Sequence, residues 1–152
     1  MTFLTLAAVK QANAAADHHF FDRDTMRFFS SRALGPVMGG RFFITTERRG
    51  FEYYGRGATI RCALNSGSVE TVGEGLNEYA TPDAARRAIR AAIKSGDVTV
   101  RFDPYRDRGT EQAPPFALDR FEWRAYIGDL PIGVRTTNAA ATRIAAEVCE
   151  SV

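Results

Sequence analysis

The chain has 152 residues, of which 45% are hydrophobic and 25% are charged; this is typical of a globular protein and excludes a largely disordered chain. A net charge of +2 excludes a strongly acidic nucleic-acid mimic, and no stretch approaches the ~20 apolar residues of a membrane span. Cys62 and Cys149 lie far apart without metal-ligand spacing, which predicts reduced thiols in the core and a cytoplasmic protein.

The first 38 residues (1–38) are predicted to form an N-terminal helical segment. Alanine-rich residues 3–16 favour a helix, and Lys10 interrupts the apolar run too early for a signal peptide. Asp24 is typical of a residue that caps a second, short helix ending near Phe29. Pro36 and its neighbouring glycines then indicate a loop.

A three-stranded antiparallel sheet followed by a helix is predicted for residues 39–96. Residues that favour or alternate like β-structure indicate strands over 41–47, 59–64 and 68–73, most simply in a meander. Thr81-Pro82-Asp83 then begins a helix with an apolar stripe, which ends at Ser95-Gly96.

Residues 97–152 show the same order of elements. Strands are predicted over 98–102, 121–126 and 130–134, with a turn at Gly128-Asp129, and a last Ala-rich helix runs from 139 to 149. Aligning Thr81 with Thr136 superimposes the two helices; either an internal duplication or chance similarity of alanines explains the match. We therefore predict an α+β protein whose two sheet–helix units pack together as one compact protein.

No sequence motif predicts catalysis. The chain contains no P-loop, HExxH, CxxC or GxSxG pattern, so we expect no catalytic residues, no cofactor and a protein that is not an enzyme. His18 and His19 are the only histidines, and they could bind a metal together with Asp17 and Asp22. A solvated helix end is the better interpretation, and we predict no metal site.

Two groups of arginines are candidate contact surfaces. The first combines guanidinium groups with aromatic rings and is predicted to bind a protein partner through Arg48, Arg49, Phe51, Tyr53, Tyr54 and Arg56. The alternative is a hairpin whose aromatic rings pack on its own sheet. The second group lies on the helix after the first sheet, where Arg86, Arg87 and Arg90 either contact nucleic-acid phosphates or form its solvated face.

The order of three strands and a helix, with Val72-Gly73-Glu74 leading to Tyr79-Ala80-Thr81 and then Arg86-Arg87, resembles the AP2-type DNA-binding pattern. This resemblance implies a sheet that lies in the DNA major groove. It would place Arg41 and Arg61 against the nucleic acid, although the tryptophans of that family are missing here.

Residues of about 20–95 resemble the start of small uncharacterised proteins of tailed bacteriophages. The resemblance rests on Phe20-Phe21, Asp24 to Phe29 with Arg32, Gly39 to Thr45, and Thr71-Val72-Gly73-Glu74. It implies a phage or prophage accessory protein in a bacterial host cell. We accordingly predict a non-enzymatic protein that binds and modulates a host or defence protein complex, like an anti-CRISPR inhibitor, with a homodimer left open. The alternatives are an AP2-like nucleic-acid-binding module and a small enzyme.

Overall fold

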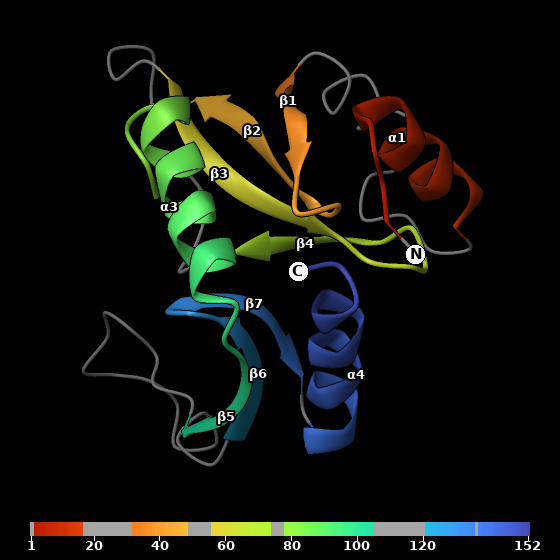
Figure 1. Ribbon diagram of the computed structural model, residues 1–152, viewed down its shortest axis with the longest axis vertical. Coiled ribbons are helices and arrows are strands. Elements are labelled where there is room, and N and C mark those ends of the chain that lie inside the picture. The colour runs from red at the N-terminus through yellow and green to blue at the C-terminus, as the bar shows by residue number, and fades with distance from the viewer. Residues whose placement is uncertain (1, 17–31, 49–55, 74–77, 105–120, 136) are drawn as a thin grey trace.

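Two antiparallel sheets and three helices make up the described part of the computed structural model, which comprises residues 2–16, 32–48, 56–73, 78–104, 121–135 and 137–152 (Figure 1). In chain order the elements are α1 (Leu6–Ala15), β1 (Ala33–Met38), β2 (Phe42–Arg48), β3 (Arg56–Ala63), β4 (Val69–Val72), α3 (Pro82–Ser95), β5 (Val98–Pro104), β6 (Phe121–Ile127), β7 (Leu130–Arg135) and α4 (Asn138–Cys149). The predicted α+β class is confirmed. No helix in the described ranges has the length and apolar character needed to cross a membrane.

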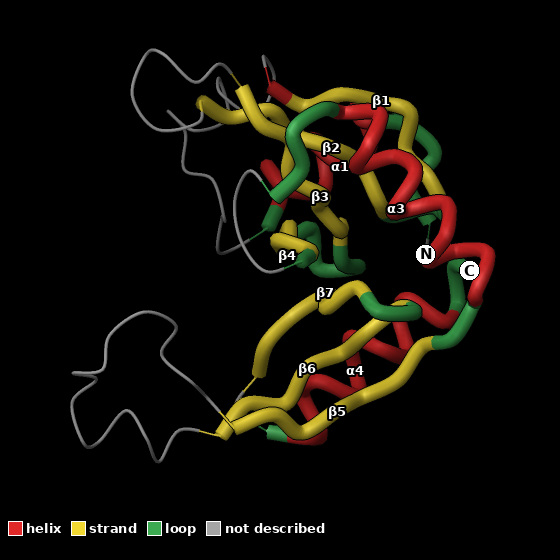
Figure 2. The backbone as a smooth tube through the Cα atoms, turned by 90° about the vertical axis from the view of Figure 1, so that its left-hand side faces the viewer, coloured by secondary structure: helices red, strands yellow, loops and turns green. Residues whose placement is uncertain are grey.

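The two sheets meet along one edge of each. The strands of the first follow the order β1-β2-β3-β4, and those of the second β5-β6-β7. The backbone N–H of Gly73, just after β4, donates to the carbonyl of Pro131 in β7 at 2.8 Å. Figure 2 shows β4 and β7 next to each other where the two sheets approach. β7 is an edge strand of its sheet, which is a position that tolerates Pro131 because proline has no N–H to donate to a neighbouring strand.

The first sheet has four strands, and the prediction of three was wrong. The additional strand, β1, occupies residues expected to be a loop at the end of the helical segment 1–38. Proline is tolerated there because β1 is an edge strand, paired only with β2, in which the missing N–H of Pro36 removes no ladder bond. The short helix expected from Asp24 lies outside the described residues.

A threonine caps each described helix. The hydroxyl oxygens of Thr5, Thr81 and Thr137 each accept a hydrogen bond at 3.2 Å from the backbone N–H three residues later. The cap of α4 is therefore Thr137, one residue beyond the Thr136 that was aligned with Thr81 from the sequence. An offset of 56 then superimposes buried residues of the two helices: Ala85 on Ala141, Ile89 on Ala145, and Ala92 on Val148.

Both faces of the first sheet are covered. On one face α1 packs over buried side chains that include Phe43, Ala63 and Val69. On the other face lies a larger core that includes residues of β2, β3, β4, α3, β6, β7 and α4. That core joins the two sheet–helix units, because Ile60 and Ile89 of the first unit belong to the same cluster as Ile127 of the second.

Candidate functional site

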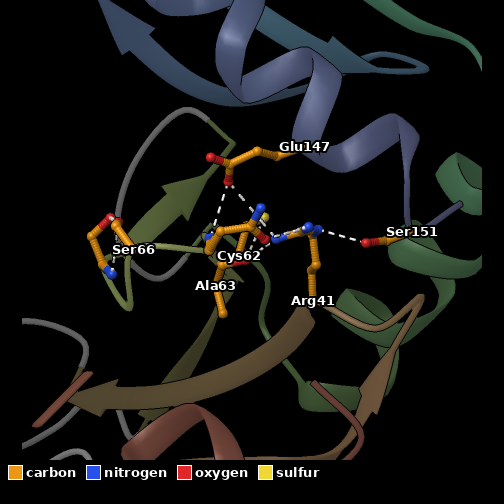
Figure 3. A network of polar contacts seen from close by, with 8 residues as sticks. Arg41, Cys62, Ala63, Ser66, Glu147 and Ser151 are labelled. Carbon is orange, nitrogen blue, oxygen red and sulfur yellow. Dashed lines mark hydrogen bonds and ion pairs between the residues drawn. The ribbon is translucent and has the colours of Figure 1, made fainter. Parts of the chain in front are cut away.

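Arg41 is buried, with none of its surface exposed to solvent. Its Nε donates to the hydroxyl of Ser151 at 2.7 Å, its Nη1 to the carbonyl of Ala63 at 3.1 Å, and its Nη2 to Asn65 Oδ1 at 2.7 Å. The carboxylate of Glu147 in α4 lies 3.9 Å from Nη1 (Figure 3). The expectation that Arg41 contacts nucleic acid is therefore wrong: its guanidinium holds the first sheet to the C-terminal helix.

Arg61 is also inside the protein, only 3% exposed. Its Nε donates to the hydroxyl of Thr45 at 2.9 Å and its Nη1 to the hydroxyl of Thr71 at 2.6 Å, so it bridges the two strands beside β3. A buried guanidinium needs such partners because its desolvation is unfavourable. Since both arginines are buried and both faces of the first sheet are covered, this sheet cannot enter a DNA groove as the AP2-like pattern implied.

Cys62 lies next to this network and is fully buried. Burial raises the pKa of the Cys62 thiol, and the nearby Arg41 only partly opposes that rise. The neutral thiol is therefore the stable form, and it packs as a core residue instead of acting as a nucleophile. Both cysteines are free, but Cys149 is exposed at the end of α4, so the prediction of core thiols is correct for Cys62 and wrong for Cys149.

The outer face of α3 carries a stripe of basic side chains, Arg86, Arg87, Arg90 and Lys94, which we call the α3 stripe. Successive members are one, three and four residues apart, which places them opposite the buried side chains Ala85, Ile89 and Ala92. Three of the four side chains are exposed. The sequence predicted the position of this stripe correctly, since the helix periodicity is unambiguous.

Arg86 differs from the rest of the α3 stripe because its guanidinium is engaged in intramolecular contacts. Its Nη1 lies 2.9 Å from the carboxylate of Asp83, and its Nη2 donates to the carbonyl of Gly35 in β1 at 3.3 Å. Arg87, Arg90 and Lys94 make no hydrogen bond or ion pair with a described residue. These three cations are therefore the part of the stripe that is available to a partner.

The second sheet carries a further group of arginine and aromatic side chains that the sequence analysis did not single out. The guanidinium of Arg101 stacks 4.3 Å from the centre of the Tyr126 ring, a cation–π contact. On the opposite face, the rings of Phe102 and Trp123 lie 4.8 Å apart, and Phe102 is 46% exposed. The alternation of apolar and polar residues in Val98–Phe102 was the available signal for the two faces.

The remaining predicted positions lie at or beyond the limits of the described structure. Arg48 and Arg56 are paired at the ends of β2 and β3, and Arg49, Phe51, Tyr53 and Tyr54 lie outside the described residues, so this contact surface stays a prediction. His18 and His19 also lie outside the described residues. Within the described ranges, no three His, Cys, Asp or Glu side chains are grouped as metal ligands.

Comparison with known proteins finds one family. Residues 5–90, more than half of the chain, match the model described as a family of unknown function, DUF7447. The match includes the first sheet with both buried arginines and the first three members of the α3 stripe. No curated protein and no solved structure matches the chain.

Proposed function

The chain belongs to the DUF7447 family, and from this premise we propose that it is a non-enzymatic binding protein that docks the α3 stripe onto an acidic surface of a bacterial protein complex. Because the sequence resembles phage proteins, we propose more specifically that the partner is a host or defence complex, and that the chain inhibits it as an anti-CRISPR protein would. The observation that supports it is the exposure of Arg87, Arg90 and Lys94 on one helix face.

Charge and rigidity suit the α3 stripe to recognition. The only acidic residue of α3 is Asp83, and it is engaged by Arg86, so the other three cations of the helix are not neutralised within it. The helix is capped at both ends, by Thr81 and by Gly96 with a φ of 63°, and its apolar side is packed in the core. A fixed row of cations of this kind steers an acidic partner to the surface.

A protein partner is preferred to nucleic acid because the sheet surface that the AP2-like pattern requires is covered. Nucleic acid remains the alternative ligand of the α3 stripe, since arginines bind phosphate as readily as carboxylate. The two partners differ in their response to nuclease and in how steeply affinity falls with salt.

The test is a capture experiment from bacterial lysate with immobilised protein, with and without nuclease, followed by mass spectrometry. We expect a defined acidic protein that survives nuclease and is lost with the Arg87→Glu/Arg90→Glu variant. The matched control is Arg143→Glu, which reverses an exposed arginine on α4 and should retain the partner. Recovery of nucleic acid, with protein lost on digestion, would replace the proposal by the alternative.

The same experiment also tests the contact surface predicted from the sequence around Arg48, Arg49 and Arg56. Reversing Arg48, Arg49 and Arg56 to Glu weakens capture if the predicted Arg/aromatic segment also contacts the partner. If this triple variant binds normally while the α3 variant does not, the contact surface is α3 alone. If neither variant loses the partner, the proposed docking surface is wrong.

A further inference from the structure

The outer edge of the second sheet is open in the part of the chain that the structure describes. On its inner side, β5 pairs with β6, and the carbonyl of Asp97 accepts a hydrogen bond from the N–H of Gly128 at 2.7 Å. Antiparallel pairing alternates, so Val98 and Val100 direct their N–H and C=O groups away from β6, toward the outer edge. No described residue is hydrogen-bonded to these groups.

The other sheet edges are protected in ways that β5 is not. β1 contains Pro36 and an irregular register against β2, and β7 is joined to the end of β4 by the bond from Gly73. The β5–β6 register is regular from Val98 to Pro104, and no proline precedes Pro104 in β5. A regular strand edge with unpaired backbone groups is a template for a further strand.

We propose that this edge binds a second copy of the same chain, β5 against antiparallel β5, with the two-fold axis at Thr99. In this register Val98 of each copy forms a hydrogen-bonded pair with Val100 of the other. Asp97 then lies opposite Arg101 of the other copy, once on each side of the axis, and both residues are exposed. In the single chain the Arg101 guanidinium stacks on Tyr126 and donates to the carbonyl of Gly128 at 3.4 Å. Dimerisation would therefore turn this exposed side chain outward to the carboxylate of Asp97. The edge is thus complementary to itself in backbone groups and in charge.

The helix above β5 fits the same arrangement. α4 packs across β5, β6 and β7, and its Glu147 side chain is directed toward the first sheet, where it accepts a hydrogen bond from the N–H of Asn65 at 3.0 Å. Across the helix axis from Glu147 lie exposed small residues at helical spacing: Ala139, Thr142, Ala146 and Cys149. A two-fold axis perpendicular to the sheet places both α4 helices on one face, where small side chains permit close approach.

Sedimentation equilibrium of the full chain over a dilution series tests this dimer. We expect a mass of twice 16.8 kDa that falls to the monomer value on dilution. Val100→Pro removes an outward N–H without breaking a bond to β6, and it should yield a monomer that retains the circular dichroism spectrum. A monomer at every concentration, or a Val100→Pro variant that still dimerises, would overturn the proposal.

A charge exchange distinguishes this register from other dimers. Asp97→Arg alone and Arg101→Asp alone place like charges opposite each other twice, so each should weaken the dimer about tenfold. The double variant restores both pairs and should recover the dimer. Asp129→Arg is the matched control, because it makes the same change in the exposed β6–β7 turn. If the double variant is as weak as the single ones, the register is wrong.

A disulfide provides an independent readout. In a Cys149→Ser background, Thr99→Cys should form an intermolecular disulfide, because the two Thr99 residues form a closely spaced cross-strand pair. Asp129→Cys is the control and should stay a monomer under the same oxidation. If the edge instead binds a strand from a different protein, the purified chain will be a monomer, and that result counts against the dimer. The inference does not depend on the proposed function, because it rests on β5 and not on the α3 stripe.

Discussion

The two sheet–helix units have the same order of elements but different surroundings. The first sheet is enclosed, with α1 on one face and the shared core on the other, and two arginines are buried within it. The second sheet is packed against α4 and has a regular outer strand that no described residue extends. Arginine is therefore a buried structural residue in the first unit, at Arg41 just before β2 and at Arg61 in β3. In the second unit Arg101 of β5 is an exposed surface residue.

The largest loss of stability is expected from a change at Arg41, which links the two units. Arg41→Met should lower the free energy of unfolding by about 3 kcal/mol, because Asn65 and Ser151 lose a charged partner inside the protein. The measurement is urea unfolding at a fixed protein concentration, followed by circular dichroism and by the fluorescence of Trp123, the only tryptophan. Both signals should shift together, because one core contains residues of both units.

The control for this variant is Arg87→Gln, which removes a charge from the exposed face of α3. It should change stability by less than about 0.5 kcal/mol. Equal effects of the two variants would mean that the Arg41 network does not hold the units together.

The helix caps test which residue of the second unit is equivalent to Thr81 of the first. Thr81→Ala and Thr137→Ala should each destabilise the protein by about 1 kcal/mol, because each removes the acceptor of a backbone N–H at a helix start. Thr136→Ala should have a much smaller effect if Thr137 is the equivalent of Thr81. Thermal or urea unfolding of the three variants decides the register; a larger loss for Thr136→Ala would restore the alignment on Thr136.

The last expected effect is the dependence of stability on pH that arises from Cys62. Burial raises the pKa of its thiol in the folded protein, whereas in the unfolded chain the thiol ionises near its ordinary pKa of about 8.5. Its contribution to stability is therefore fully present below that pH and is lost as the pH rises above it, at up to about 1.4 kcal/mol per pH unit. The free energy of unfolding between pH 8 and 10 should fall less steeply in Cys62→Ala than in the wild type. Identical slopes would contradict a buried, neutral thiol.

Local sequence signals predicted most of the described helices and strands. Threonine caps, a proline in the first helical turn and Gly96 marked the helices, and alternating residues marked β3, β4 and β5, because these signals act within a few residues. The sequence also placed the α3 stripe opposite the apolar face of its helix. It did not predict β1, since Pro36 reads as a loop until a neighbouring strand supplies the pairing.

Only the tertiary structure decided which arginines are available to a partner. Arg41 and Arg87 are the same residue type, yet the first is surrounded by Ser151, Ala63 and Asn65, which are distant from it in sequence. Burial of a charged side chain depends on the partners that the whole fold brings around it, and no local pattern records those partners. The open edge of β5 is likewise a property of how the strands assemble and not of the residues within any one strand.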